Sequence, residues 1–345
     1  MFGESAKPLV EAYDLAMLDL DGVVYIGEKA VPGAPQHLAR ARELGVHLAF
    51  ITNNASRPPE AVVEKLAGIG VAASVADVVT SAQAAARVLV EEYGPGAAVA
   101  VLGARGLEDA LRAVGLEPVP IGAERAVAMV SGYGPDVVWR DVMRAAMRVR
   151  DGLPWVASNA DLSLPTANGP APGHGVMVDL LERYAGVEAV VAGKPRRPLL
   201  DETVRLVGGE HPLMVGDRLD TDIEGAHEAE VDSLLVLTGV TGLGDLVAAT
   251  PRLRPTYLAA DLGGLFTPHV APVSEGGGTW RSGDWRATTT AGRLEVAGQG
   301  GADDWWRAVA AAAWEHLDRT GEAVSVEGLA APRTDADEVD GSLAP

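Results

Sequence analysis

The stretch Leu15–Gly27 reads LAMLDLDGVVYIG and points to the kind of fold that we expect for this chain. It begins as an apolar strand and ends in two aspartates, Asp19 and Asp21, that are separated by one residue. Residues i and i+2 of an extended chain point to the same side, so the two carboxylates lie roughly 6–7 Å apart. At that distance they repel by about 2–3 kcal/mol at an effective dielectric constant of about 20. We therefore expect a cation or a proton to neutralise the pair.

The rest of the chain continues the pattern that this strand begins. Short apolar runs alternate with amphipathic helical patterns almost to residue 260, which is typical of a doubly wound parallel α/β sheet, Rossmann-like in plan. The expected strands are Leu15–Leu20, Val46–Thr52, Ala98–Leu102, Ala126–Val130, Trp155–Ser158, Ala189–Ala192, Leu213–Val215 and Ser233–Leu237. The expected helices are Ala34–Leu44, Pro59–Gly68, Ala82–Glu92, Leu107–Val114, Val138–Val149, Gly175–Tyr184 and Leu199–Val207.

Polar clusters follow four of the expected strands. Functional groups of such sheets lie beyond the carboxyl ends of the strands, so we expect these clusters to form one site. The clusters are Asp19-Leu20-Asp21-Gly22, Thr52-Asn53-Asn54, Gly193-Lys194-Pro195 and Gly216-Asp217-Arg218.

The spacing of these clusters predicts an inserted domain. The segment between Asn54 and Gly193 is far longer than the roughly 30 residues of one crossover unit. We expect a core domain in two parts, 1–80 and 190–268, with an α/β cap domain at 81–189 inserted between them. A Gly-rich linker at 269–278 leads to a small α+β extension at 279–332, and residues 333–345 are expected to be disordered. In the extension we expect strands at Thr279–Ala287 and Gly292–Ala297, then a helix capped by Asp303.

Composition excludes several classes of function. The formal net charge of −20 argues against nucleic acid and anionic membranes as partners, and requires a locally positive site for any phosphorylated substrate. With no cysteine there is no disulfide scaffold, thiolate zinc site or cysteine nucleophile. The N-terminus lacks the pattern of a signal peptide, and no run of 18 apolar residues occurs, so a cytoplasmic protein is expected.

The four motifs together match the needs of aspartyl-phosphate chemistry. A carboxylate attacks phosphorus only if the negative charge around it is offset, and hard oxygen ligands select Mg²⁺. The motifs DLDGVVYIG, ITNNASR, GKP and GDRLDTDI occur in this order. Over about residues 12–268 the chain therefore resembles the phosphatases of the haloacid dehalogenase superfamily, in the class with a large α/β cap (class IIA).

The resemblance implies a role for each residue of the catalytic and metal motifs. Asp19 would be the nucleophile and a Mg²⁺ ligand. Asp21 would act as general acid and then general base, and would bind Mg²⁺ through its backbone carbonyl. Lys194 would neutralise Asp19 and the phosphoryl group. Asp217 would bind Mg²⁺ directly, whereas Asp222 would reach the ion through water or orient the groups around it.

The resemblance also implies substrate contacts. Thr52 and the Asn53 amide would hold phosphate oxygens, together with Lys194 and the neighbouring Asn54. In the cap, the segment 158–165 is the candidate specificity loop, and its Asn159 and Asp161 resemble a family element at the border between cap and core. His174 follows this loop and either contacts substrate or lies in the core or on the surface, the last two being the more common places for a histidine.

Several substrates stay open. The overall plan resembles that of actinobacterial glycerol 3-phosphate phosphatases, whose C-terminal extension resembles part of an acetyltransferase, so glycerol 3-phosphate is the expected small phosphorylated metabolite. The alternatives are 2-phosphoglycolate, pyridoxal phosphate and nucleoside monophosphates. A non-catalytic phospho-ligand-binding protein or a receiver-like signalling module is a remote alternative, and Asp21 and the long insertion count against the receiver. Caps of this class often form dimers, so a homodimer is expected from the resemblance alone.

Overall fold

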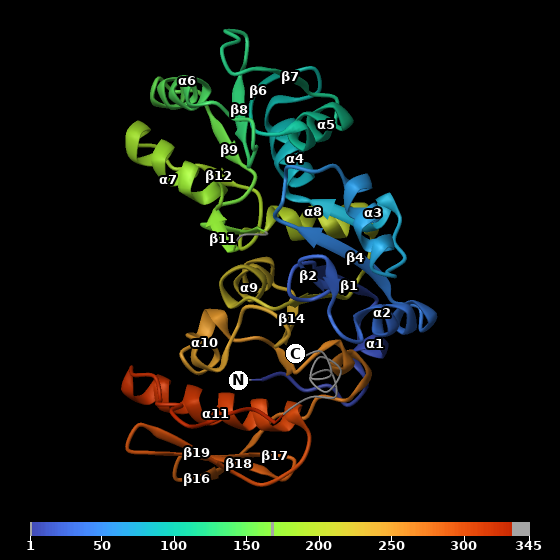
Figure 1. Cartoon of the computed structure of the whole chain (residues 1–345), viewed down its shortest axis with the longest axis vertical. Helices are drawn as coiled ribbons and strands as arrows, with labels where there is room; N and C mark the ends of the chain where they lie inside the picture. Colours follow the sequence, from blue (N-terminus) through green and yellow to red (C-terminus); the bar gives the residue numbers. More distant parts are fainter. Residues whose placement is uncertain (1, 167–168, 333–345) are drawn as a thin grey trace, which may run out of the picture. The chain divides into compact units, whose positions relative to one another are not determined.

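The computed structural model describes residues 2–166 and 169–332, so the expected disorder of 333–345 lies outside the described residues. Within the described residues the chain divides into two compact units, one made of residues 2–48 and 209–332 and the other of the residues between 49 and 208. Both contain parallel sheets covered by helices, and the first also carries an antiparallel sheet near its C-terminal end (Figure 1). The predicted α/β class with a small α+β extension is confirmed.

The parallel sheet of the first unit contains the apolar strand that ends at Asp19. Strand β1 (Leu15–Asp19) lies beside β13 (Pro212–Gly216), which is followed by β14 (Asp232–Val236) and β15 (Tyr257–Ala259), and all these pairs are parallel. The first four residues of β1 are buried, as expected of a strand covered on both faces. Further elements are α1 (Leu9–Ala12), the hairpin β2 (Tyr25–Ile26) and β3 (Lys29–Ala30), α2 (Ala34–Glu43), η2 (Leu219–Ile223), α9 (Glu224–Ala229), α10 (Leu243–Val247), η3 (Pro251–Leu253) and η4 (Leu262–Phe266).

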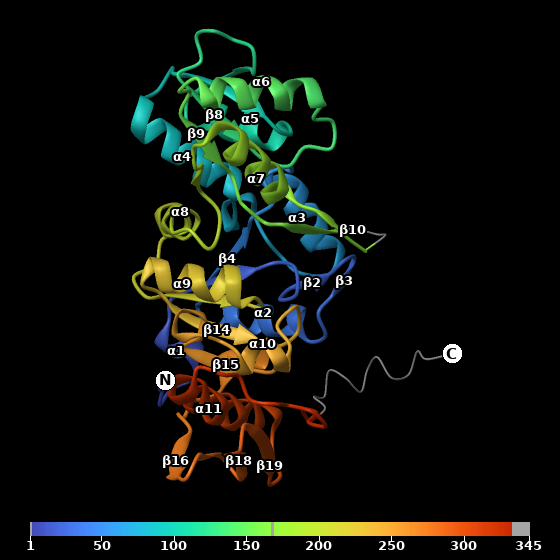
Figure 2. The same cartoon turned by 90° about the vertical axis from the view of Figure 1, so that its left-hand side faces the viewer.

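The extension of this unit has more strands than the sequence predicts. The antiparallel sheet runs β16 (Val273–Gly276), β17 (Thr279–Ser282), β18 (Trp285–Thr290), β19 (Arg293–Ala297), and α11 (Ala302–Thr320) packs on it (Figure 2). The predicted strand Thr279–Ala287 is wrong as a single strand, because a turn at Gly283 divides it into β17 and β18. The predicted cap is wrong too, since Gly301 is the N-cap of α11 and the Asp303 carboxylate instead accepts the N–H of Ala260.

The second unit contains a parallel sheet in the order β12-β9-β8-β6-β7. Helices α6 and α7 share one buried cluster with this sheet, and α4 packs against α5 (Figure 1). The sheet strands are β6 (Ala98–Leu102), β7 (Glu117–Pro120), β8 (Ala128–Ser131), β9 (Trp155–Ala157) and β12 (Val190–Val191). The helices are α3 (Pro59–Gly68), α4 (Ser81–Tyr93), α5 (Arg105–Ala113), α6 (Trp139–Arg150), α7 (His174–Ala185) and α8 (Pro198–Val207).

Further strands lie outside this sheet. Strand β4 (His47–Thr52), of which all but the first two residues belong to this unit, pairs in parallel with β5 (Val78–Thr80) through Phe50, Ile51 and Thr52. Strands β10 (Ser163–Thr166) and β11 (Gly169–Pro172) form a hairpin that lies in the predicted specificity loop and just after it. A capping box between Thr80 and Gln83 starts α4 directly after β5. Among the described helices, none combines the length and the apolar character needed to cross a membrane.

Candidate active site

Three carboxylates meet at one edge of the parallel sheet in the first unit. Asp19 ends β1, Asp217 follows β13, and Asp222 lies in η2, a π-helical turn. Because β1 and β13 are parallel neighbours, their carboxyl ends lie at the same edge. One oxygen of each carboxylate lies within 4.8 Å of the other two. The structure thus brings the predicted Asp19 and Asp217 together and adds the side chain of Asp222 to them.

Backbone groups of the loops hold two of these carboxylates in place. Oδ2 of Asp222 accepts hydrogen bonds from the N–H groups of Asp217 and Arg218, both at 3.1 Å. Oδ2 of Asp217 accepts the N–H of Val240 at 2.6 Å, and its backbone carbonyl accepts the N–H of Thr241. The loop after β13 is therefore fixed by its own hydrogen bonds, and Asp217 and Asp222 are both fully buried.

The donor set of this cluster fits a hard divalent cation. Two unit charges 4.8 Å apart repel by about 3 kcal/mol at an effective dielectric constant of about 20, so three carboxylates at this spacing favour a cation among them. Carboxylate oxygens are the ligands that Mg²⁺ and Ca²⁺ prefer. The side chain of Asp21 is not a member of the cluster, and its predicted metal contact runs through the backbone carbonyl.

The turn after β1 packs closely against the carboxylate of Asp217 in this cluster. Gly22 has a φ of +87°, and a Cβ added there would lie 2.6 Å from Cγ of Asp217. Its N–H donates to the carbonyl of Tyr25, and its own carbonyl accepts the hydroxyl of Thr238 at 2.6 Å. Only glycine combines this backbone conformation with so close an approach. Asp21, which precedes this turn, is exposed.

A second group of predicted site residues meets in the second unit around Asn53. Its side-chain Nδ2 donates to Oδ1 of Asp161 and to the carbonyl of Lys194, both at 3.0 Å, and its Oδ1 accepts the N–H of Lys194 at 2.8 Å. Its backbone carbonyl accepts the side chains of Ser81 and Asn159, both at 2.6 Å. The side chain of Asn53 thus joins three segments that are distant in the sequence. This bracing role was missed by the sequence analysis.

Lys194 itself is only 2% exposed. A buried ammonium group is stable only beside negative or polar groups, so a lysine in this position is typical of an anion-binding site. Thr52 is also buried, and its hydroxyl accepts the N–H of Asn54 at 3.1 Å. Asn54 is exposed, and its Oδ1 accepts the N–H and the hydroxyl of Ser56. Asn54 therefore shapes the loop after β4.

His174 belongs to the core of the second unit. It is 3% exposed, and its Nε2 lies 3.1 Å from the hydroxyl of Ser131, which also accepts the indole N–H of Trp155. Burial lowers the pKa of His174 from 6.5 to about 4, because the low-dielectric surroundings disfavour the imidazolium. Of the three places that the sequence left open for His174, the structure supports the core, where the histidine is neutral.

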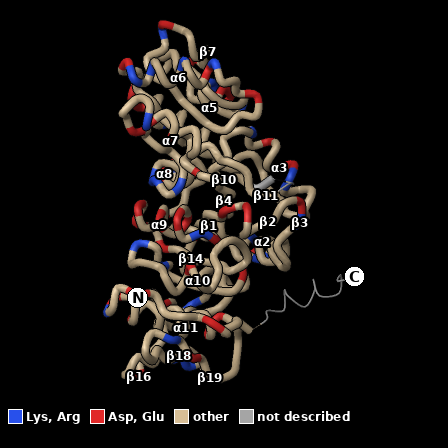
Figure 3. The backbone as a smooth tube through the Cα atoms, turned by 60° about the vertical axis from the view of Figure 1, so that its left-hand side comes forward, with Lys and Arg blue, Asp and Glu red and all other residues tan. Residues whose placement is uncertain are grey.

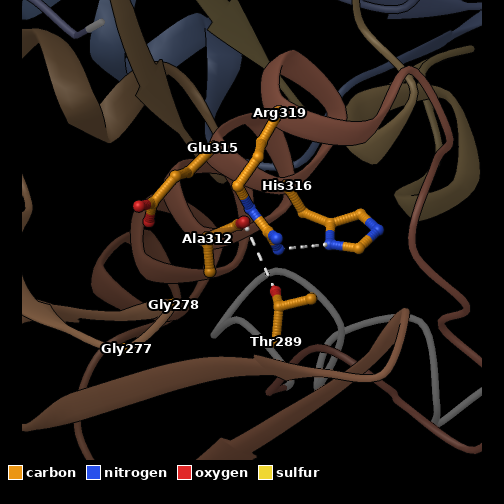
Figure 4. A pocket seen from close by; sticks show the side chains of 7 residues that line it. All are labelled: Gly277, Gly278, Thr289, Ala312, Glu315, His316 and Arg319. Atoms are coloured by element: carbon orange, nitrogen blue, oxygen red, sulfur yellow. Dashed lines mark hydrogen bonds between the residues drawn. The ribbon is translucent and has the colours of Figure 1, made fainter.

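A polar cavity of about 350 Å³ lies in the extension, at a distance in sequence from every predicted site residue (Figure 4). Arg319 donates to Nδ1 of His316 at 3.4 Å, and the hydroxyl of Thr289 donates to the carbonyl of Ala312. The cavity is lined by Gly277, Gly278, Thr289, Ala312, Glu315, His316 and Arg319. Glu315 and Arg319 are exposed and carry opposite charges, so the cavity has no strong preference for one sign of ligand.

A parallel α/β unit with a carboxylate cluster at the ends of its strands has the plan of a metal-dependent α/β enzyme. Residues 16–117 match the family model of haloacid dehalogenase-like hydrolases, and residues 191–265 match a second, HAD-hydrolase-like model. The chain belongs to the haloacid dehalogenase-like hydrolase family. The predicted resemblance is confirmed.

Curated relatives and solved structures agree with this assignment. The chain is 40% identical over 322 residues to the D-glycerol 3-phosphate phosphatase of Mycobacterium tuberculosis, covering 90% of this chain and 88% of that protein. It is 33% identical to an acid sugar phosphatase of Staphylococcus aureus, covering 73% of this chain and 96% of that protein. The M. tuberculosis glycerol phosphate phosphatase in complex with magnesium is similar with a TM-score of 0.80 at 40% identity, covering 90% of this chain and 92% of that chain.

A shorter structural relative shows how much of the chain is additional. The 4-nitrophenylphosphatase of Thermotoga maritima is similar with a TM-score of 0.69 at 29% identity. The similarity covers 97% of that protein but only 74% of this chain. About a quarter of this chain therefore has no counterpart in that phosphatase.

Proposed function

We propose that the protein is a Mg²⁺-dependent phosphatase that hydrolyses a small phosphate monoester, glycerol 3-phosphate, through a phosphoaspartate intermediate. The observation that carries the proposal is the cluster of Asp19, Asp217 and Asp222 at the carboxyl ends of β1 and β13. The 40% identity to a D-glycerol 3-phosphate phosphatase over most of both chains supports the choice of substrate.

In the proposed reaction two aspartates divide the chemistry. An oxygen of Asp19 attacks phosphorus, and the bond from phosphorus to the glycerol oxygen breaks while Asp21 donates a proton to that oxygen. Asp21 then removes a proton from the water that hydrolyses the phosphoaspartate. The exposure of Asp21 suits a group that must meet both a leaving alcohol and water. Lys194 offsets the negative charge of the phosphoryl group.

Asp19, the backbone carbonyl of Asp21 and Asp217 hold the metal in this proposal, and Asp222 keeps the loop of Asp217 in place. When bound, Mg²⁺ supplies positive charge that offsets the carboxylates and the phosphate oxygens. Oδ2 of Asp217 accepts the N–H of Val240, and the N–H of Asp217 donates to Asp222, so the carboxylate has little freedom to turn away.

Thr52, the Asn53 amide and Asn54 take the phosphate oxygens in the proposal, together with Lys194. Asn159 and Asp161 act through Asn53, which both of them contact. The cap is the segment 81–189 predicted from the sequence, and it sets specificity by enclosing the alcohol part of the substrate. The alternatives are 2-phosphoglycolate, pyridoxal phosphate and nucleoside monophosphates as substrates.

Phosphate release from a panel of esters in the presence of Mg²⁺ tests this function. The panel holds both enantiomers of glycerol 3-phosphate and the three alternative substrate types, with Asp19→Asn as the blank because it removes the nucleophile and keeps the shape. We expect a preference for glycerol 3-phosphate that chelation abolishes reversibly. Full activity of Asp19→Asn, or turnover that persists in chelator, would contradict the mechanism. A preference for another ester would replace the substrate alone.

We also propose that two copies associate through the outer face of α6 and α7. The two helices lie side by side (Figure 3). Arg150 donates to the hydroxyl of Tyr184 across them at 2.9 Å. Apolar side chains at four-residue spacing are exposed on both: Trp139, Met143 and Met147 on α6, and Val176, Leu180 and Tyr184 on α7. An exposed apolar patch of this kind is typical of an interaction site. Sedimentation velocity should find a dimer that Met143→Glu dissociates, and a monomer at all concentrations would contradict this proposal.

A further inference from the structure

The C-terminal extension lies beyond the residues that the family models match, since the second model ends at residue 265. Helix α11 nevertheless packs on the parallel-sheet part of its own unit (Figure 1), and hydrogen bonds connect the two near both ends of the helix. Near its start, the buried Arg307 donates from Nε to the carbonyl of Leu258 in β15 at 3.0 Å. Near its end, Asp318 accepts two hydrogen bonds from Arg254, at 2.6 and 2.7 Å. The extension is therefore built into the unit that carries the carboxylate cluster.

Trp314 is the residue of α11 that connects it to the loops of that cluster. It is 3% exposed, and its indole N–H donates to the carbonyl of Leu246 in α10 at 2.8 Å. It shares one buried apolar cluster with Leu219 and Ile223, which are the first and last residues of η2. The other buried members of this cluster are Leu235, Leu246, Ala249, Leu258 and Ala310.

Both of these contacts lead to members of the carboxylate cluster, Asp222 and the predicted metal ligand Asp217. Leu219 and Ile223 are the two ends of the turn that carries Asp222. The buried apolar cluster therefore packs against this turn and holds it in place. The segment just before α10 supplies the N–H groups of Val240 and Thr241 that hold Asp217. Helix α11 thus contacts the turn of Asp222 through the apolar cluster, and it contacts α10, which follows the segment that holds Asp217.

We propose that the C-terminal extension is part of the support of the metal site, and that Trp314 is a positioning residue that keeps residues 217–223 in the geometry that binds Mg²⁺. The proposal rests on the proposed function, which places the metal at this cluster. Groups that do not touch a metal but orient its ligands commonly change metal affinity by about 10–100-fold when they are mutated. A tryptophan that packs beneath two ligand loops fits this kind of role.

A matched pair of tryptophans on the same helix provides the test. Trp314→Leu removes the indole ring that packs against η2. Trp305→Leu removes an equally buried tryptophan that packs with Ala287 and Leu294 of the extension sheet. We would measure the Kd for Mg²⁺ of the full-length protein by calorimetry, together with the thermal midpoint. The expected result is a Kd raised about tenfold in Trp314→Leu and changed by less than about twofold in Trp305→Leu, at a similar loss of thermal stability. An unchanged Kd in Trp314→Leu, or equal rises in both variants, would overturn the proposal.

A milder variant keeps the test decisive if Trp314→Leu does not fold. Trp314→Phe keeps an aromatic ring and loses the hydrogen bond to Leu246, so we expect a rise in Kd of about threefold, and no rise would overturn the proposal.

Amide hydrogen exchange of the metal-free protein separates this inference from the proposed function. Faster exchange at 217–223 and 240–241 in the Trp314 variant but not in Trp305→Leu supports positioning. If the wild-type protein binds no Mg²⁺, the proposed function fails while the exchange rates still decide whether Trp314 holds the loop.

Discussion

The backbone N–H of Asp217 donates a hydrogen bond of 3.1 Å to Oδ2 of Asp222, its neighbour in the carboxylate cluster. One buried carboxylate therefore fixes the position of the other by holding the start of its loop. Asp222 uses the same oxygen to accept the N–H of Arg218. Its side chain closes the turn after β13, whatever its other oxygen binds.

Removing this acceptor should weaken metal binding without touching Asp217. We expect Asp222→Ala to raise the Kd for Mg²⁺ by about 10–100-fold, and Asp222→Asn to have a smaller effect because an amide oxygen still accepts the two N–H groups. Asp220→Ala is the matched control, since Asp220 lies in the same turn but is 65% exposed and pairs only with Arg218 among the contacts described. Calorimetric titration with Mg²⁺ measures all three, and equal effects of Asp220→Ala and Asp222→Ala would contradict the bracing role.

The adjacent residues Asn53 and Asn54 should respond differently to the same substitution. Asn53→Asp replaces the Nδ2 donor by a carboxylate oxygen that faces Asp161 and the carbonyl of Lys194. We expect it to lower the free energy of unfolding by about 3 kcal/mol, because two hydrogen bonds are lost and two carboxylates meet. Asn54 only accepts through its side-chain oxygen, so Asn54→Asp should change stability by less than about 0.5 kcal/mol. Urea unfolding of both variants provides the measurement, and similar losses would show that Asn53 is not a brace.

Most of the parallel-sheet architecture could be predicted from the sequence. The apolar runs that gave β1, β6, β13 and β14 are continuous because these strands are buried on both faces. The helix Pro59–Gly68 was predicted with its observed bounds, since Pro59 marks its first turn. The missed strands β5, β7 and β15 span only three or four residues, too few for a periodic pattern.

The site was predictable where it follows from strand ends and not where it depends on distant contacts. Asp19 and Asp217 were expected together because parallel neighbours end at one edge. Asp222 was expected near the metal from the family resemblance alone, because its place depends on a π-helical turn. The brace around Asn53 joins it to residues 108 and 141 positions away, a relation that only the folded chain creates.

Gly22 and Gly27 offer a test of the turn that follows β1. Both have a positive φ, but an added Cβ at Gly22 meets the carboxylate of Asp217, whereas one at Gly27 meets nothing within 4 Å. Each alanine substitution should lower the free energy of unfolding by about 1 kcal/mol through backbone strain. We expect only Gly22→Ala to lose Mg²⁺ affinity and turnover as well. Unfolding curves and Mg²⁺ titration of both proteins give the comparison, and retained Mg²⁺ affinity in Gly22→Ala would show that the turn does not press on Asp217.

The buried His174 predicts a loss of stability in mild acid. Its pKa is about 4 in the folded protein and 6.5 as a free group, because burial disfavours the imidazolium. Between these values the unfolded chain binds a proton that the folded chain does not, so the stabilisation is complete above about pH 6.5 and is lost as the pH falls toward 4. The full effect on the free energy of unfolding is about 3 kcal/mol.

The variant His174→Gln does not titrate and can still hydrogen-bond the hydroxyl of Ser131, so its free energy of unfolding should decrease less steeply as the pH is lowered. Urea unfolding at intervals from about pH 7 to about pH 4.5 measures both slopes. Part of the slope will remain in the variant, because burial lowers the pKa of His269 in the same direction. Parallel curves for the wild type and His174→Gln would mean that His174 is protonated in the fold at the same pH as in the unfolded chain.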